Sequence, residues 1–264
     1  MSGTQNIFAV RSLSNNHRFL FICGLHRSGT SLLHNILRDH PDISGFTNTG
    51  APEDEGQHLQ TVYPTGRASG GPGKFCFDTA AHLTEASPLV NDANRTKLLA
   101  EWSRFWNLNK PILLEKSPPN VIRSRFLQAM LPNCYFIFIV RHPIAVSLAT
   151  QKWSHTSIPE LLQHWQKAHE IMQNDLPHIS KKIVITYEEL VQHPQKSIQG
   201  LYHFLNITDK AISDATNIQE AMNTKYFDTW EHEYESTPIP DSLAAMCQKY
   251  GYSFSKPYYT PVSF

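Results

Sequence analysis

The stretch GLHRSGTS, Gly24–Ser31, places two glycines at the spacing of a nucleotide-binding P-loop. That motif reads Gly, four residues, Gly, Lys and then Ser or Thr, and its lysine reaches the β- and γ-phosphates. Here Thr30 stands at the lysine position and Ser31 at the hydroxyl position. The loop therefore keeps the glycine spacing of a phosphate site but lacks the cation that nucleotide hydrolases use.

The residues on either side of the loop predict a strand before it and a helix after it. RFLFICG, residues 18–24, is a short apolar run that ends in glycine, as a buried parallel strand does. TSLLHNILRDHP, residues 30–41, carries its leucines and isoleucine on one helical face and stops at Pro41. A phosphate loop requires this context, because the helix N-terminus presents free N–H groups and a positive dipole end to an anion.

Further strand–helix alternation predicts an α/β, P-loop-containing three-layer fold with a central parallel β-sheet flanked by helices. The expected strands are 111–118, 134–143 and 182–187, and the expected helices are 91–109, 120–133, 143–153, 160–172 and 194–207. Polar residues follow each strand: Glu115–Ser117, Arg141–His142 and Tyr187–Glu188. Because ligands of such sheets bind beyond the carboxyl ends of the strands, we expect these residues to converge with the loop.

Composition narrows the function classes. The 264 residues hold 41% hydrophobic and 17% charged residues, which is typical of a folded globular protein. Equal counts of 23 basic and 23 acidic residues argue against general nucleic-acid binding. No stretch approaches 18 apolar residues and the N-terminus has no apolar core, so we expect no membrane span, no signal peptide and a cytoplasmic, bacterial location. We expect one domain, 1–264, with residues from about 45 to 110 forming the acceptor side.

The cysteine pattern indicates buried residues rather than a metal site. The four cysteines, Cys23, Cys76, Cys134 and Cys247, show no metal-ligand spacing, and Cys23 and Cys134 lie beside apolar runs as core residues do. A Cys76–Cys247 disulfide remains open.

A nucleotide hydrolase also needs a strand-end Asp for Mg²⁺, whereas Glu115 here is followed by Lys116. The pattern predicts a metal-free, cationic pocket in which Arg27 restores positive charge.

Three stretches together resemble the sulfotransferase superfamily, which uses 3′-phosphoadenosine 5′-phosphosulfate (PAPS) as sulfuryl donor. GLHRSGTSLLHNIL is similar to its 5′-phosphosulfate loop, FIFIVRHPIAVS to its 3′-phosphate element, and ITYEELVQHPQKSIQGLYHFLNI to its third element. They lie in the family's order and span residues 18–207. The Arg-containing loop and YEELVQHP are most similar to the protein-tyrosine sulfotransferase-like and bacterial sulfotransferase branch.

The resemblance implies a role for individual residues. The 5′-phosphosulfate would be bound by Arg27, Ser28, Gly29, Thr30 and Ser31, the 3′-phosphate by Arg141, and the nucleotide would lie near Tyr187. Lys116 would contact the sulfuryl group or its bridging oxygen. Lys225 would either cover the nucleotide or be a solvated surface lysine. The family usually carries a Ser eight residues after the arginine, where this chain has Ala149; Ser147 is the preferred substitute and Thr150 the alternative.

Sulfuryl transfer to a hydroxyl needs a general base. In the tyrosine branch the base looks to be a Glu after the first helix, and GAPEDEGQHLQ offers Glu53, Asp54, Glu55 and His58. We favour Glu55, then Glu53, with His58 as the histidine alternative, and expect the three carboxylates to raise one another's pKa. The acceptor is left open among a glycan, a phenol, a lipid, a peptide tyrosine and a metabolite. Two rivals remain: a P-loop kinase and a non-catalytic PAPS binder.

Overall fold

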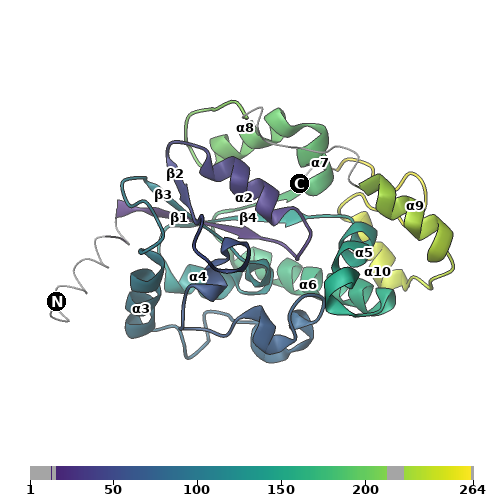
Figure 1. Ribbon diagram of the computed structural model, residues 1–264, viewed down its shortest axis with the longest axis horizontal. Helices are drawn as coiled ribbons and strands as arrows, with labels where there is room; N and C mark the ends of the chain where they lie inside the picture. The colour runs from purple at the N-terminus through teal and green to yellow at the C-terminus, as the bar shows by residue number, and fades with distance from the viewer. Residues whose placement is uncertain (1–12, 14–15, 213–222, 263–264) are drawn as a thin grey trace.

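A five-stranded parallel sheet forms the centre of the computed structural model, which describes residues 13, 16–212 and 223–262 (Figure 1). The strands are β1 (Arg18–Cys23), β2 (Ile43–Gly45), β3 (Ile112–Lys116), β4 (Cys134–Val140) and β5 (Lys182–Thr186), in the spatial order β2-β3-β1-β4-β5. All of their pairings are parallel. The predicted fold class and the four predicted strands are confirmed, while the short edge strand β2 was not foreseen.

Helices cover both faces of the sheet, and β1 divides its side chains between them. Leu20 and Ile22 pack on one face with α2 (Thr30–Arg38), α7 (Tyr187–Gln192) and α8 (Pro194–Phe204). Phe19, Phe21 and Cys23 pack on the other face with α3 (Asp92–Trp102), α4 (Ser124–Met130) and α6 (Ile158–Asp175). Because β1 is apolar on both faces, it fits only at the centre of such a sheet.

Some helix boundaries differ from the predicted ones for local reasons. Residues 118–122 form a 3₁₀ helix that begins with two prolines, so the helix expected from residue 120 starts only at Ser124. A capping box formed by Ser157 and Glu160 starts α6 at Ile158, ahead of the expected residue 160. Asn91 caps α3, and the helix expected over residues 91–109 ends at Trp102.

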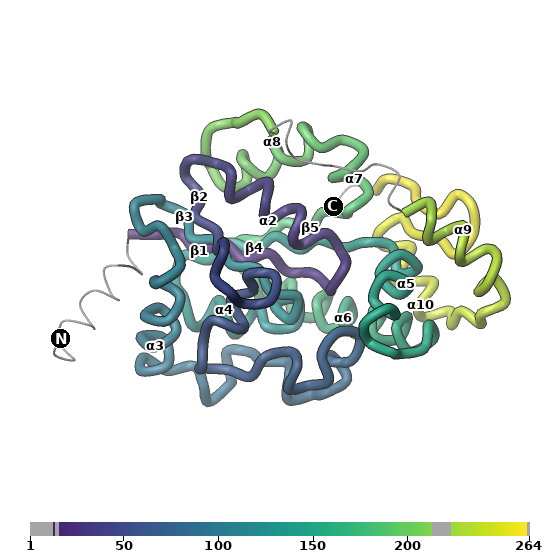
Figure 2. Tube along the Cα trace, viewed as in Figure 1, coloured from purple at the N-terminus to yellow at the C-terminus, as the bar shows by residue number. Residues whose placement is uncertain are grey.

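The chain between β2 and β3 lies mainly on the α3 side of the sheet, and the C-terminal helices pack at the opposite end (Figure 2). This chain segment contains 3₁₀ turns at 52–54, 56–58, 66–69, 75–77 and 79–81, followed by α3. The C-terminal part, whose structure the sequence did not predict, forms α9 (Thr224–Glu233) against α5 (Pro143–Ser154), and α10 (Asp241–Gln248) against α6.

The cysteine predictions can be compared with the structure. All four are buried and free, which confirms Cys23 and Cys134 as core residues and leaves no Cys76–Cys247 bridge. Across the described residues, every helix is too short or too polar to cross a membrane. The predicted lack of an apolar leader concerns residues 1–16, nearly all of which lie outside the described part.

Candidate active site

The loop after β1 leads directly into the N-terminus of α2. Gly29 precedes the first helical residue, Thr30, and no side chain caps the helix. The first N–H groups of a helix have no partner within it, so they are available to an anion. Gly29 has φ 100°, and a Cβ there would lie 2.5 Å from Cδ2 of Tyr187. Ser28 supports the loop from within, since its Oγ donates to the Leu25 carbonyl over 2.7 Å.

A pocket of about 330 Å³ lies over this loop at the carboxyl ends of the strands. Eight of its lining residues are ones that the sequence singled out: Arg27, Gly29, Thr30, Ser31, Glu53, Glu55, Arg141 and Tyr187. Four are not: His26, Leu32, Pro118 and Trp153. The expected convergence of the strand ends is therefore confirmed for β1, β4 and β5.

Arg141, directly after β4, contacts Arg27 of the loop, Asn223 and Tyr187. Its Nη1 donates to the Arg27 carbonyl over 2.8 Å, and its Nε and Nη2 donate to Oδ1 of Asn223 over 2.9 and 2.7 Å. Its guanidinium lies 4.1 Å from the ring centre of Tyr187. Asn223 in turn donates to Oε1 of Glu188 over 2.6 Å. Arg141 is thus held by a buried network, in which Nη1 reaches the loop and the Nε–Nη2 fork is bonded to Asn223.

Arg27 is the exposed cation of the loop. Its backbone has φ 67°, a left-handed conformation that non-glycine residues adopt rarely. Its guanidinium lies 4.7 Å from the ring centre of Trp153, whose side chain is 54% exposed at the end of α5. Cation–π contact of this kind holds a flexible arginine at the pocket mouth. No sequence pattern marks Trp153, because its place depends on how α5 packs.

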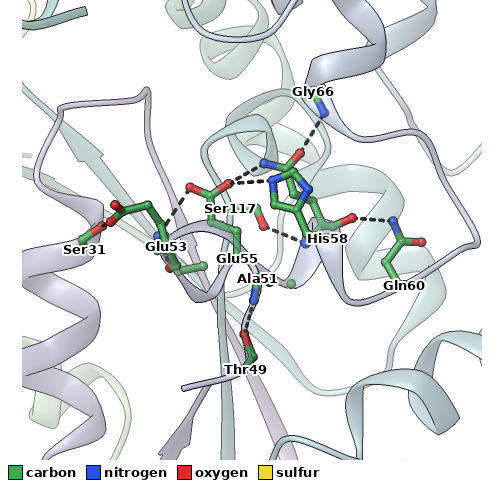
Figure 3. Close-up of polar contacts among 12 residues, drawn as sticks. Ser31, Thr49, Ala51, Glu53, Glu55, His58, Gln60, Gly66 and Ser117 are labelled. Carbon is green, nitrogen blue, oxygen red and sulfur yellow. Dashed lines mark hydrogen bonds and ion pairs between the residues drawn. The ribbon is translucent and has the colours of Figure 1, made fainter. Parts of the chain in front are cut away.

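Glu55 is the buried carboxylate of the pocket lining, and Figure 3 shows its polar contacts. Its side chain accepts from Nε2 of Gln57 over 2.5 Å, lies 3.5 Å from Nζ of Lys116 and 3.8 Å from Nε2 of His58. Burial raises the pKa of Glu55, and the positive charge of Lys116, the Gln57 hydrogen bond and His58 oppose that rise. The carboxylate is therefore a stronger base than an exposed glutamate, yet it has partners for its charged form.

The neighbouring acids behave differently from what the sequence predicted. Asp54 points away and accepts from the backbone N–H groups of Asn48 and Thr49 and from Oγ1 of Thr49. Burial is the largest single influence and raises the pKa of Asp54, but these hydrogen bonds and the charge of Arg38 together outweigh it and lower that pKa. The expected mutual raising is thus wrong for Asp54, and burial is the leading cause at Glu55. Glu53 faces the loop, with Oε2 3.4 Å from Oγ of Ser31.

The other predicted residues, His58 among them, lie outside the pocket lining. Lys116 is buried behind Glu55, where its Nζ also donates to the Glu53 carbonyl over 2.9 Å. Ser28 points into the loop. Ser147 lines a separate cavity of about 10 Å³ together with Thr150, so neither candidate substitute for the family serine faces the pocket. Lys225 is exposed on α9, with Nζ 5.0 Å from the ring centre of Tyr226.

Comparisons with known proteins identify the family of this chain. The model of the Sulfotransferase family matches residues 20–211. Protein-tyrosine sulfotransferase 2 of Gallus gallus is 28% identical over 201 residues, which cover 72% of this chain and 51% of that protein. Protein-tyrosine sulfotransferase of Drosophila melanogaster is 24% identical over 221 residues, covering 75% and 40%. The chain spans about half the length of these curated relatives.

Solved structures show the same fold. The sulfotransferase domain from the Curacin biosynthetic pathway has a TM-score of 0.57 at 17% identity, covering 90% of this chain and 99% of that one. The sulfotransferase domain from the Synechococcus PCC 7002 olefin synthase has the same TM-score and identity and covers 90% and 96%. Since the family match extends over most of the chain, from β1 to the residues after α8, this protein belongs to the Sulfotransferase family.

Proposed function

We propose that this protein transfers a sulfuryl group from PAPS to an acceptor hydroxyl, in line and without a metal ion. One observation carries the proposal: a single pocket joins an uncapped helix N-terminus and two arginines to a buried carboxylate of raised pKa. The first set suits an anionic donor and the second suits proton removal from an acceptor. Neither set alone would distinguish a transferase from a nucleotide binder.

The residues present fit such a donor. Its 5′-phosphosulfate would lie on the free N–H groups and hydroxyls at Gly29–Ser31, with Arg27 beside it. Arg141 would take the 3′-phosphate with the second N–H of Nη1 and of Nη2, since the first is bonded to Arg27 or Asn223, and a guanidinium binds oxyanions with two parallel hydrogen bonds. Bound in this way, PAPS supplies the activated sulfuryl group.

The chain's own residues would perform the remaining chemistry. Glu55 would accept the proton of the acceptor hydroxyl, and a positioned base of this kind contributes about 10²–10⁴-fold to rate. Arg27 and the loop N–H groups would stabilise the charge that grows on the oxygen from which the sulfuryl group departs. Lys116 contacts Glu55 in this structure, so its first role would be to hold that carboxylate in place.

The acceptor is proposed only as a class, a molecule that carries a hydroxyl group. The curated relatives are named as protein-tyrosine sulfotransferases, so peptide tyrosine is the first acceptor to test here. Glycans, phenols, lipids and small metabolites with hydroxyl groups complete the screen. The kinase alternative would require Mg²⁺ and ATP, which a loop with Thr30 at the lysine position does not favour.

The donor site can be tested by calorimetry with 3′-phosphoadenosine 5′-phosphate in the absence of Mg²⁺. We expect binding that Arg141→Lys weakens by about 10–100-fold, since the bidentate donor fork is lost. Arg125→Lys is the matched control, because Arg125 pairs with Glu85 and Asp175 outside the pocket. Tighter binding of ATP with Mg²⁺, or an Arg141→Lys variant that binds like wild type, would refute the donor assignment.

The base can be tested on any acceptor that the screen identifies. Glu55→Gln should lower kcat by about 10²–10⁴-fold and leave donor affinity within about threefold, because only proton transfer is removed. Glu53→Gln, at the next candidate, should keep most of the activity. The reverse ranking of these two variants would move the role of base to Glu53.

A further inference from the structure

A second carboxylate, Glu115, lies fully buried behind Glu55 and takes no part in the chemistry described so far. It is the fourth residue of β3 and lies opposite Phe21 of β1 in the sheet. A buried acid in a strand interior costs free energy unless it is hydrogen-bonded. The hydrogen-bond partners of Glu115 therefore indicate its role.

Both oxygens of Glu115 are occupied by donors. Oε1 accepts from the backbone N–H of Gly56 over 2.9 Å and from Oγ of Ser117 over 2.5 Å. Oε2 accepts from Nδ2 of Asn120 over 2.5 Å. The first of these bonds reaches across 59 residues to the backbone directly after Glu55.

The contacts continue to Glu55 itself. Oγ of Ser117, oriented by its bond to Glu115, accepts from the backbone N–H of Gln57 over 3.0 Å. The Gln57 side chain then donates to Oε2 of Glu55 over 2.5 Å. Glu115 thus fixes the two residues that follow Glu55, one directly and one through Ser117. Fixing them sets the position of the Glu55 carboxylate in the pocket.

Gly56 is shaped for this contact. A Cβ on Gly56 would lie 2.5 Å from both Cγ and Oε1 of Glu115. Only a residue without a side chain allows the carboxylate to approach the backbone this closely. The Gly56 carbonyl is also held, since it accepts from Nε1 of Trp102 over 2.9 Å.

We propose that Glu115 is a positioning residue, which holds the Glu55–Gln57 turn in place and whose charge is coupled to that of Glu55. The proposal rests on the proposed role of Glu55 as base. It assigns a function to the acid in the strand-end sequence Glu115-Lys116-Ser117, with Lys116 and Ser117 as the other members of the support.

The coupling has a defined sign. Burial raises the pKa of Glu115 to about 7, the negative charge of Glu55 adds to the rise, and Ser117, Asn120 and Lys116 oppose it. Other titratable groups that its charge reaches are Cys23 on β1, Tyr63 and Arg123. Glu55 therefore ionises first and Glu115 second, as a coupled pair. The second ionisation makes Glu55 more basic, so activity should rise again near pH 7.

The Gly56 amide gives a readout that is independent of catalysis. In ¹H–¹⁵N NMR of the full chain, its chemical shift should titrate near pH 7, since its N–H bonds Glu115. Glu115→Gln should abolish this titration, and Glu55→Gln should lower its midpoint, because the neighbouring negative charge is gone. Asp175→Asn, at a buried carboxylate paired with His82 and Arg125, is the matched control and should change nothing. An unchanged midpoint in Glu55→Gln would refute the coupling.

Kinetics separate positioning from a merely structural role. Glu115→Gln should remove the rise near pH 7 and lower kcat at pH 8 by about tenfold, with donor affinity unchanged within about twofold. A purely structural residue would lower activity or thermal stability with the shape of the pH profile intact, and that outcome would overturn the proposal. Gly56→Ala, which keeps both carboxyl groups but displaces Glu115, should also lower kcat. Failure of the donor to bind would refute the proposed function. The coupling between Glu55 and Glu115 is tested independently of it by the titration of the Gly56 amide.

Discussion

Ala149 stands eight residues after Arg141, where the sulfotransferases that this chain resembles usually carry a serine. Residues four apart share one face of a helix, so Ala149 lies on the same face of α5 as the pocket residue Trp153. Ser147 and Thr150 face the small inner cavity instead, where neither hydroxyl has a hydrogen-bond partner. Helix geometry therefore argues against Ser147 as the replacement.

This orientation predicts a gain of affinity at residue 149. Ala149→Ser should tighten binding of 3′-phosphoadenosine 5′-phosphate by about 3–10-fold, because one hydrogen bond to an oxyanion is added. Ser147→Ala is the matched control and should change the affinity by less than about twofold. Calorimetry on both variants decides the matter: weaker binding by Ser147→Ala would show that Ser147 reaches the phosphate after all.

At the scale of elements, the junction between β1 and α2 depends on a glycine pressed against α7. Gly29→Ala should destabilise the fold by about 3 kcal/mol, since a left-handed backbone costs about 1–2 kcal/mol and its Cβ would meet the Tyr187 ring at 2.5 Å. Gly50→Ala isolates the backbone cost, because Gly50 has φ 80° but no atom within 4 Å of its Cβ position. Urea unfolding of both variants measures the difference, and equal losses would mean that the loop moves away from Tyr187 at no cost.

Some elements of the fold could be predicted from the sequence and others could not. β1, β3, β4 and β5 were predictable because apolar runs end in polar residues, and the loop because glycine spacing reflects backbone geometry. β2 has three residues and no recognisable period. The contact between Asn223 and Arg141 could not be predicted from the sequence, because 82 residues separate them and only the packing of α9 brings them together. The sequence favoured Glu55 over Glu53 without showing that Glu55 is buried and Glu53 exposed, because a string of acidic residues does not reveal burial.

For the whole molecule, buried histidines predict a sensitivity to mild acid. Burial lowers the pKa of five histidines to about 3 or 4: His26, His34, His142, His164 and His169. The unfolded chain binds these protons from about pH 6.5 downward and the folded chain does not, so stability is lost as the pH falls. Glu55, Glu115 and Glu188 have raised pKa values and act in the opposite sense above pH 4.5. The net loss should therefore be moderate down to about pH 4.5 and steep below it.

His164→Phe tests this balance at one position. The ring packs against Phe75 with centroids 4.8 Å apart, and its Nε2 has no hydrogen-bond partner, so phenylalanine keeps the packing and removes the titration. The variant should lose less stability than wild type on going from pH 6.5 to 4.5, by about 1.4 kcal/mol for each pH unit. Urea unfolding at pH 7.5, 6.5, 5.5 and 4.5 measures the slopes, with His203→Gln, at an exposed histidine of α8, as the control. Parallel curves for His164→Phe and wild type would place the acid sensitivity in the carboxylates rather than in the buried histidines.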